Sequence, residues 1–459
     1  MADRIWVDVE DLFEWKGRPS GIQRVEFELC RALVSLPQSK DRLFFVRHNT
    51  KRRRLIAIPW EAVEAVYDSM SNGDRDKSVI VRVAKKLIDI LPPSLGLACV
   101  ARGLARVGRA AMARARVTLA KTTPLEINDH FDVAATPGDT VAVLGLAWNS
   151  DDYTSYIEMA IREKRVRFAL LIYDISPLRR PEWFTRWTAE HFRAWFEKTL
   201  PLAHVILTIS TATATDVAAY TRERGMVLRA VPIPIPIGTG FMTRRALPPS
   251  ALASRLPPPN SYVLIVSTIE VRKNHALLFR VWRRLLDDMS ATSVPTLVFA
   301  GRVGWLTSDL MEQLQNCDFL GGKIIHIESP TDEELEVLYA GCLFTLFPSF
   351  YEGWGLPVTE SHAFGRPSII SNTTSLPEAG GSLARYIDPD NATEAYRIIR
   401  ETIEDRTGLQ EWRTRVRLEF KPVEWSQSAR AVLQVLDATS FHGWIDGGGE
   451  ARPMPIDSL

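Results

Sequence analysis

The chain has 459 residues, of which 46% are hydrophobic and 24% are charged, and its formal net charge is +1. This length is ample for two domains with full hydrophobic cores, and the composition is that of an ordinary soluble globular protein. A net charge near zero argues against a general affinity for nucleic acid. Four cysteines without close spacing and eight histidines without a His-x-x-x-His pattern argue against a bound metal ion.

The N-terminus gives no sign of export. Residues 1–10 are acidic and lack the apolar core of a secretory signal peptide. No run in the sequence approaches the ~18 to 20 consecutive apolar residues of a membrane-spanning helix. The scattered cysteines suit a reducing compartment. We therefore expect a cytoplasmic protein, with any membrane contact peripheral, on the inner face of the cytoplasmic membrane.

The first half of the chain alternates between strand and helix patterns. Residues 5–9 predict a strand, and a glycine- and proline-rich turn follows at 17–21. The next residues carry apolar side chains at helical spacing: Val25, Leu29, Ala32, Leu33 and Leu36. Three further strands are expected at 140–146, 168–174 and 205–209. This alternation predicts a parallel sheet covered by helices, with ligands beyond the carboxyl ends of the strands.

The segment 80–121 departs from the neutral average, because it holds nine Lys or Arg residues against one acid, Asp89. Apolar residues fall on one face of a predicted helix, and arginines fall on the other: Arg102, Arg106, Arg109 and Arg116. Such a helix suits docking on anionic lipid headgroups, which would bring a lipid-linked acceptor close. It equally suits a helix that covers the sheet and turns its arginines to solvent. The sequence leaves both interpretations open.

Proline-rich stretches at 231–239 and 247–260 follow the last of these strands and predict an interdomain linker. The alternating pattern then resumes, with strands expected at 262–266, 296–300, 324–327 and 343–347. Thr331 and Glu334 have the spacing of a capping box, which predicts the start of a helix. The second half therefore predicts another parallel sheet covered by helices.

A basic turn, Arg272-Lys273-Asn274, stands between the first strand and first helix of this second half. Two cations at the carboxyl end of a strand suit the neutralisation of a diphosphate leaving group. The alternative interpretation is a basic turn that faces solvent.

The stretch from Phe347 to Pro367 combines a strand end, a glycine-bearing loop and a helix expected at 356–364. Backbone N–H groups at a helix N-terminus lack intrahelical partners and carry the positive end of the helix dipole, so they favour phosphate. Glu352 lies in the loop and Glu360 in the helix, and both can accept hydrogen bonds from hydroxyl groups. The alternative is a glycine-rich turn that merely joins a strand to a solvated helix.

This stretch resembles the retaining nucleotide-sugar glycosyltransferases of family 4, whose signature is Glu, seven residues and Glu after a Pro-Ser motif. The resemblance continues through Arg366-Pro-Ser, Ser375-Leu-Pro-Glu378 and the turn at Arg272. It implies an α/β protein of GT-B architecture, with two doubly wound, Rossmann-like parallel-sheet domains facing a central cleft. The Arg-Lys-Asn turn is similar to that of mannosyltransferases of polysaccharide assembly.

The resemblance assigns a role to each part of this second-domain site. Glu352 would grip donor-sugar hydroxyls and stabilise the positively charged transition state, and Glu360 would bind the ribose. Lys273 and Arg272 would hold the diphosphate. They would be assisted by the backbone N–H groups of Gly353, Trp354, Gly355 and Leu356.

In the first domain the resemblance places Ser20 and Gly21 in a loop that faces the cleft, although an ordinary turn with a capping serine is the alternative. Tyr173 and Asp174 match a His-Asp pair of the family. Tyrosine at 173 puts a side-chain role in doubt, whereas its backbone carbonyl remains able to contact the donor sugar. Asp174 is an expected cleft acid, although an Asp at such a position often caps a turn.

The resemblance implies a metal-independent enzyme without a cofactor, whose donor substrate is a nucleoside-diphosphate sugar. We expect transfer of a hexose, with GDP-mannose as first choice of donor, to a glycan or lipid-linked acceptor in synthesis of cell-surface polysaccharide, including lipopolysaccharide. Two alternatives stay open. One is a sugar-nucleotide epimerase of similar architecture, which needs no acceptor. The other is a non-catalytic subunit that binds glycan or nucleotide.

The expected organisation has five parts. Residues 1–240 form an acceptor-binding domain that contains the basic segment, and 241–260 form the linker. Residues 261–422 form the nucleotide-sugar-binding domain. A helix at 423–440 crosses back to the first domain, and a flexible tail covers 441–459.

Overall fold

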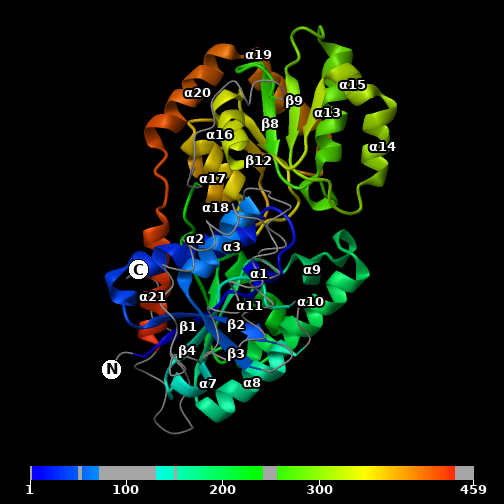
Figure 1. Cartoon of the computed structure of the whole chain (residues 1–459). Coiled ribbons are helices and arrows are strands. Elements are labelled where there is room, and N and C mark those ends of the chain that lie inside the picture. Colours follow the sequence, from blue (N-terminus) through cyan, green and yellow to red (C-terminus); the bar gives the residue numbers. More distant parts are fainter. Residues whose placement is uncertain (1–2, 50–53, 72–130, 149–151, 241–255, 440–459) are drawn as a thin grey trace, which may run out of the picture.

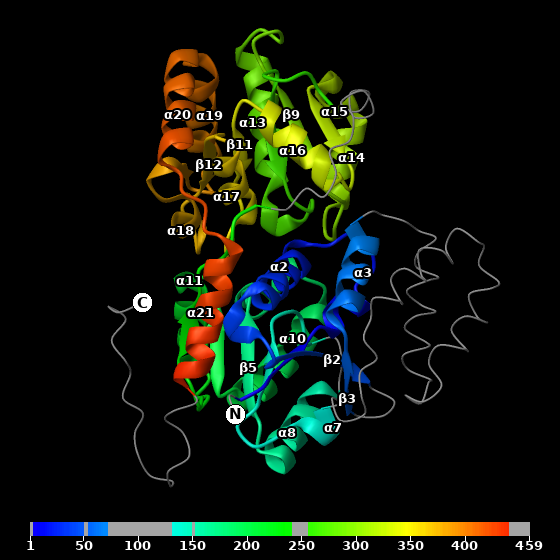
Figure 2. The ribbon, with the colours of Figure 1, turned by 60° about the vertical axis from the view of Figure 1, so that its left-hand side comes forward.

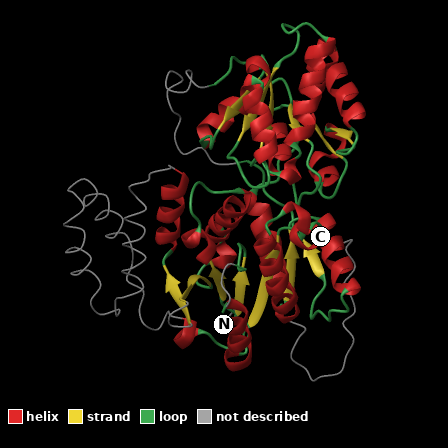
Figure 3. Cartoon of the chain, turned by 90° about the vertical axis from the view of Figure 1, so that its right-hand side faces the viewer, coloured by secondary structure: helices red, strands yellow, loops and turns green. Residues whose placement is uncertain are grey.

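The computed structural model describes residues 3–49, 54–71, 131–148, 152–240 and 256–439. Within them, two separate β-sheets lie one above the other, each with helices on both faces (Figure 1, Figure 3). The basic segment at 80–121, the first part of the linker at 241–260 and the tail at 441–459 lie outside the described residues.

The first sheet is made of short strands. The strands are β1 (Ile5–Asp8), β2 (Leu43–Asn49), β3 (Arg54–Ile58), β4 (Thr140–Val143), β5 (Arg167–Ile172), β6 (Val205–Thr208) and β7 (Pro232–Pro234). Of these, β1, β4, β5 and β6 are buried along their whole length. Their order is β3-β2-β1-β4-β5-β6-β7, and all neighbours run parallel except β2 and β3. Apolar side chains on both faces of β1, β4 and β5 explain why helices cover the sheet on both sides.

The helices of the first domain connect these strands. They are α1 (Glu10–Glu14), α2 (Gly21–Ser35), α3 (Trp60–Ser71), α7 (Phe131–Ala134), α8 (Tyr153–Lys164), α9 (Ser176–Arg179), α10 (Arg186–Thr199) and α11 (Thr211–Glu223), with 3-10 turns η1 (Pro37–Ser39), η4 (Pro181–Trp183) and η5 (Leu200–Leu202). Side-chain hydroxyl groups cap the N-termini of α10 and α11. Thr185 accepts a hydrogen bond from the N–H of Thr188, and Ser210 accepts one from the N–H of Thr213.

The second sheet is entirely parallel. Its strands are β8 (Tyr262–Val266), β9 (Thr296–Ala300), β10 (Ile324–Ile327), β11 (Thr345–Phe347), β12 (Ser368–Ser371) and β13 (Arg385–Ile387). Their order is β10-β9-β8-β11-β12-β13. From β8 the chain first adds strands on one side of the sheet, β9 and β10, and then on the other side, β11 to β13. Ligands of such sheets bind between the two strands where this change of direction occurs, here β8 and β11, outside their carboxyl ends.

Helices again join the strands. They are η6 (Val271–Lys273), α13 (His275–Asp288), α14 (Ser308–Asn316), α15 (Asp318–Gly322), α16 (Asp332–Gly341), α17 (Leu356–Ala363), α18 (Leu376–Gly380), η7 (Gly381–Leu383), α19 (Ala392–Glu404) and α20 (Arg406–Glu419). The predicted capping box is confirmed at the start of α16. The N–H of Glu334 donates to the hydroxyl of Thr331 over 3.1 Å, and the N–H of Thr331 donates to the Glu334 carboxylate over 2.8 Å.

The helix α21 (Trp425–Ala438) returns from the second domain to the first. In Figure 2 it lies beside the first sheet, whereas α19 and α20 stand on the second. Its apolar face enters the core of the first domain through Ala429, Val432, Leu433 and Leu436. Trp425 packs against Gly238, where a Cβ atom would collide with the indole ring. The first domain is therefore assembled from two separated parts of the sequence.

Candidate active site

The carboxyl ends of the two sheets face each other, and their loops meet backbone to backbone. Gly353, in the loop after β11, lies so close to the carbonyl oxygen of Tyr173, after β5, that an added Cβ atom would collide with it. The hydroxyl of Thr213 donates to the carbonyls of Tyr173 and Gly353 over 3.3 and 3.4 Å. Only glycine permits this approach of the two domains.

Tyr173 turns its side chain away from this contact. Its hydroxyl donates to the carbonyl of Leu144 over 2.7 Å, and the residue is buried, at 9% exposed. The structure therefore brings its backbone carbonyl, and not its phenol, to the domain boundary.

Glu352 lies at the centre of the candidate site. It is 8% exposed, and its two carboxylate oxygens accept from Lys273 Nζ at 2.6 Å and from Arg272 Nη1 at 3.0 Å. Arg272 is also held by the Glu270 carboxylate at 2.8 Å and by the Tyr351 carbonyl at 2.6 Å. The sequence predicted Glu352, Lys273 and Arg272 as one site, and the structure brings them into direct contact.

The charges of this cluster stabilise one another. Burial by itself raises the pKa of the Glu352 carboxyl, but the positive charges of Arg272 and Lys273 outweigh it and hold that pKa below its ordinary value. Burial lowers the pKa of Lys273, and the neighbouring Arg272 lowers it further, while Glu352 opposes both. Glu352 is therefore negatively charged. Lys273, which is paired with it, loses its proton more readily than an ordinary lysine.

The loop that carries Glu352 is fixed by the segment after β12. The N–H of Glu352 donates to the Thr374 hydroxyl over 2.9 Å. The hydroxyl of Ser375 donates to the carbonyls of Glu352 and Trp354 over 2.9 and 2.8 Å. These bonds hold the loop before any ligand arrives, as a preorganised site requires.

The N-terminus of α17 directly follows this loop. Gly355 has a φ of +124°, a conformation that L side chains rarely adopt, and an added Cβ atom would stand 2.9 Å from Leu376. A Cβ atom on Gly21 would stand 3.5 Å from Leu356, so the loop of the first domain that contains Ser20 and Gly21 meets this helix end. The helix end predicted to bind phosphate and the first-domain loop predicted to face the cleft thus lie next to each other.

Ser20 also has the local role that was the alternative prediction. Its N–H donates to the side-chain oxygen of Gln23 over 3.2 Å, as part of a capping box that starts α2. Capping and proximity to the cleft are compatible, because the same turn both starts the helix and reaches α17.

Glu360, predicted to bind ribose, is 1% exposed. One carboxylate oxygen accepts from Arg24 Nη2 of α2 at 2.8 Å, and the other accepts from the Tyr339 hydroxyl of α16 at 2.9 Å. Arg24 was missed as a site residue. The available signal was its place in the Ser20-Gly21-Ile-Gln-Arg24 stretch, one helical turn beyond the capping serine.

Asp174 caps its own turn, since it accepts from the N–H and hydroxyl of Ser176 at 2.9 and 2.6 Å. Its charge nevertheless reaches the site. Burial lowers the pKa of Arg272, but Glu352, Glu270 and Asp174 together raise it above its ordinary value. Asp174 therefore lies close enough to the cleft to influence Arg272, as predicted, and it also caps a turn, which was the alternative prediction.

Several residues beside Glu352 were not predicted. A cavity of about 270 Å³ between the domains includes Glu352 in its wall together with Arg179, Trp183, Asp216, Phe350 and Tyr351. Arg179 and Trp183 belong to a cluster of basic and aromatic residues directly after β5, which was the one signal in the sequence. Nothing in the sequence marked Asp216 as a site residue, because it lies within a helix, α11.

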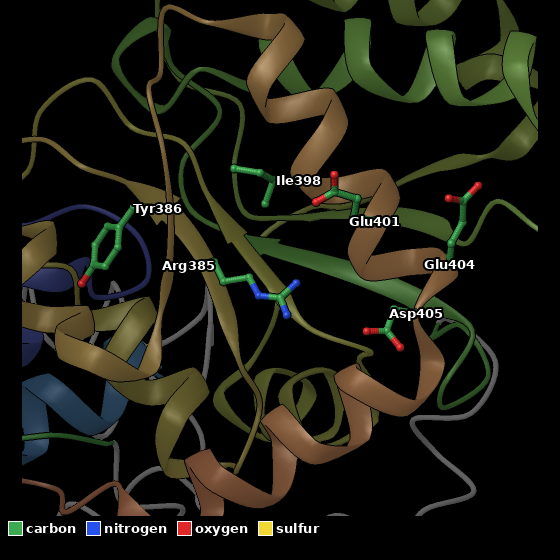
Figure 4. A pocket seen from close by; sticks show the side chains of 6 residues that line it. All are labelled: Arg385, Tyr386, Ile398, Glu401, Glu404 and Asp405. Carbon is green, nitrogen blue, oxygen red and sulfur yellow. The ribbon is translucent and has the colours of Figure 1, made fainter.

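A larger cavity of about 770 Å³ lies far from these residues, between β13, α19 and α20 (Figure 4). Its acids already have cationic or backbone partners: Glu401 pairs with Arg397, Glu404 pairs with Arg400, and Asp405 caps α20 at Gly408. Figure 4 shows Tyr386 well apart from these acids, so the lining groups do not converge on one ligand.

No group of three or more His, Cys, Asp or Glu side chains in the five described ranges is arranged to hold a metal ion. No helix in that part of the chain is both long enough and apolar enough to span a membrane.

The sequence matches known proteins most clearly in the second domain. Residues 253–419 match the model of the family described as glycosyl transferases group 1. The chain is 27% identical over 290 residues to O-antigen chain mannosyltransferase B of Escherichia coli, covering 61% of this chain and 73% of that protein. It is 28% identical over 278 residues to serotype-specific mannosyltransferase WbdA of Escherichia coli, covering 58% of this chain but only 33% of that protein.

Solved structures are similar over nearly the whole chain. HepE of Anabaena, solved in complex with UDP, has a TM-score of 0.55 and 14% identity, covering 95% of this chain and 100% of that chain. Sucrose-phosphate synthase of Thermosynechococcus elongatus has a TM-score of 0.56 and 16% identity, covering 95% and 98%. At such identities the likeness concerns the fold alone, and it confirms the predicted GT-B architecture. The second domain is thus similar to the glycosyl transferases group 1 family over residues 253–419.

Proposed function

We propose that this chain is a retaining, metal-independent mannosyltransferase. It would move mannose from GDP-mannose to a hydroxyl of a glycan or lipid-linked acceptor during synthesis of bacterial cell-surface polysaccharide. One observation carries the chemistry, namely the buried Glu352 carboxylate clamped by Lys273 and Arg272 beside the N-terminus of α17. The choice of mannose is supported by the names of the E. coli relatives.

Donor binding would redistribute the charges of this cluster. A diphosphate at the α17 N-terminus attracts Lys273, whose only described ion pair is with Glu352. Arg272 is more firmly held, since Glu270, Glu352 and the Tyr351 carbonyl all bind it. Lys273 is thus the cation free to turn to the phosphate, which releases one oxygen of Glu352 for a donor-sugar hydroxyl.

The reaction breaks the bond between the anomeric carbon and the diphosphate oxygen, and the electron pair leaves with the nucleoside diphosphate. The acceptor oxygen bonds to the anomeric carbon on the same face, and its proton passes to the departing phosphate oxygen. Negative charge on Glu352 stabilises positive charge on the sugar, and Lys273 with Arg272 stabilises negative charge on the leaving group. No enzymatic nucleophile is required.

The test is a panel of nucleotide sugars incubated with the purified chain, with and without mannose oligosaccharides, in the presence of a metal chelator. We expect glycosidic product from GDP-mannose only when acceptor is present, with the α configuration of the donor retained in its NMR spectrum. A free epimerised sugar without acceptor would indicate an epimerase instead. Inverted anomeric configuration, or activity abolished by the chelator, would contradict the proposed mechanism.

A further inference from the structure

The cavity beside Glu352 has walls from both domains. Arg179 of α9, Trp183 of η4 and Asp216 of α11 come from the first domain, and Phe350 and Tyr351 come from the loop after β11. Its volume, about 270 Å³, is near the lower limit of the roughly 300 to 1,000 Å³ typical of small-ligand sites. It therefore has room for one sugar ring rather than a longer glycan.

One wall of the cavity is aromatic. The rings of Trp183 and Phe350 are stacked across the domain boundary, with centroids 5.6 Å apart and planes inclined by 22°. The indole N–H of Trp305 donates to the Trp183 carbonyl over 2.8 Å, which fixes this wall from the second domain. Sugar rings present an apolar C–H face, and burial of such a face against aromatic side chains removes apolar surface from water.

The other wall is polar and already ordered. Asp216 accepts from Arg179 Nε at 2.6 Å and from the Tyr351 hydroxyl of the other domain. Its side chain is 23% exposed, so it is still accessible to a ligand. A carboxylate can accept about four hydrogen bonds, which leaves Asp216 capacity for sugar hydroxyls. Such a combination of an aromatic wall and a few placed polar groups is typical of a small-molecule site.

We propose that this cavity binds the terminal sugar ring of the acceptor glycan, with the ring beside the aromatic wall formed by Trp183 and Phe350 and a hydroxyl bound to Asp216. The inference rests on the proposed transfer reaction. The groups assigned to the donor diphosphate and ribose, Lys273 and Glu360, are not among the lining residues, whereas Glu352 is. A ring in this cavity is thus beside the reacting carbon but outside the nucleotide site.

A second aromatic surface suits the next part of a polymeric acceptor. Trp187, at the start of α10, is 55% exposed and stacks on His191 with centroids 4.1 Å apart, and Trp148 lies 6.3 Å from it. Trp148 follows β4, so this surface lies at the carboxyl edge of the first sheet, as the cavity does. Since the cavity takes one ring, longer acceptors would extend over this surface.

The experiment compares a mannose disaccharide and a mannose tetrasaccharide as acceptors, with GDP-mannose as donor. For Trp183→Ala and Asp216→Asn we expect the acceptor KM to rise about fivefold or more, while the dissociation constant for GDP stays within about twofold. Trp183→Phe, which keeps an aromatic ring, should restore most of the acceptor affinity. Trp187→Ala should raise the KM of the tetrasaccharide but not that of the disaccharide.

Trp195→Ala is the matched control, since this tryptophan lies on α10 and does not line the cavity. It should leave both acceptor KM values unchanged. An unchanged acceptor KM in Trp183→Ala and Asp216→Asn would overturn the assignment. A rise in donor KM with no change in acceptor KM would place the donor sugar in the cavity instead and would equally overturn it.

Direct binding separates this proposal from the proposed reaction. The tetrasaccharide should give saturation-transfer NMR signals with the wild-type chain, and Trp183→Ala should weaken them, whether or not mannose is transferred. Binding that depends on Trp183 in a chain without transferase activity would support the cavity and contradict the reaction. Transfer activity with tetrasaccharide binding unaffected by Trp183→Ala would contradict the cavity alone.

Discussion

Nη2 of Arg24 lies 2.8 Å from Oε1 of Glu360, and this ion pair joins helices of the two domains across 336 residues of sequence. The side chains are only 16% and 1% exposed, so water screens the pair weakly. Other contacts span the same boundary. Among them are the Tyr173 carbonyl at Gly353, the Trp305 indole on the Trp183 carbonyl, and the Glu378 carboxylate on the N–H groups of Thr211 and Ala212.

Breaking the Arg24–Glu360 pair from either side should destabilise the protein. Arg24→Gln and Glu360→Gln each leave a buried charge without its main partner, so we expect each to lower the free energy of unfolding by about 3 kcal/mol. The double variant should lose little more than either single variant, because no uncompensated charge remains. Denaturant unfolding measures all three, and fully additive losses would show that the residues act independently.

The proposed ribose contact gives Glu360 a separate kinetic signature. Glu360→Ala should raise the donor KM by about tenfold or more while saturated turnover falls much less, because a ribose contact is similar in ground and transition states. Donors with a deoxyribose in place of ribose should bind the wild type more weakly but bind Glu360→Ala no differently. A large fall in saturated turnover with unchanged donor KM would refute the ribose contact.

Glu352→Gln and Lys273→Ala should each lower turnover by ~100-fold or more, because both remove charge where charge develops in the transition state. Lys323→Ala is the matched control for the lysine. That side chain donates to the Val294 carbonyl at the opposite end of the second sheet, so turnover should stay unchanged. Near-normal turnover in Glu352→Gln would show that the Glu352 charge does not stabilise the transition state.

Stability of the first domain should decline as pH rises from acid to neutral. Burial raises the pKa of Asp11 from 3.8 to about 6, and burial with the neighbouring Asp11 and Asp8 raises that of Glu26 well above its ordinary value. The folded protein therefore holds protons that the unfolded chain has already released. This stabilisation is complete below pH ~4 and is lost as pH rises through the folded pKa values.

The measurement is the free energy of unfolding at about pH 5 and pH 7.5. Asp11 alone would contribute a loss of about 1.4 kcal/mol between these conditions, and Asp11→Asn should reduce the slope. Asp309→Asn, an exposed change on α14, should leave the slope as in the wild type. A slope in Asp11→Asn equal to that of the wild type would contradict the assignment.

The basic segment at 80–121 lies outside the described residues, and binding to anionic membrane surfaces stays one of the two interpretations open for it. Each basic group near such a surface contributes on the order of 1 kcal/mol. Co-sedimentation with anionic liposomes should therefore fall steeply with added salt and should weaken when Arg102, Arg106 and Arg109 become Gln. Binding that is absent at low salt, or indifferent to these changes, would favour a helix that only covers the sheet.

Local patterns predicted much of this structure. Strands β1, β4 to β6 and β8 to β11, and the capping box at Thr331, follow from apolar runs and from residue spacing. Strands β2, β3, β12 and β13 were not predicted, and the prediction of a linker at 231–239 was wrong for β7, which pairs with β6 in the first sheet. The contact of Glu352 with Lys273 could be anticipated because both follow strands of one parallel sheet. The partner of Glu360 could not be anticipated, since the Arg24 contact depends on how closely two domains approach. The inward turn of the Tyr173 side chain depends on tertiary packing in the same way.

The return of α21 to the first domain has a consequence for how the protein is made. The large core of the second domain is built from residues between Val263 and Val416, all of which leave the ribosome before α21 does. The core of the first domain includes Ala429, Val432 and Leu436, so it stays open along one face of its sheet until those residues emerge. Domains generally fold in the order of their synthesis. Here the domain that is begun first would be completed last, and a chain interrupted before α21 would expose the apolar surface of α2 that α21 covers.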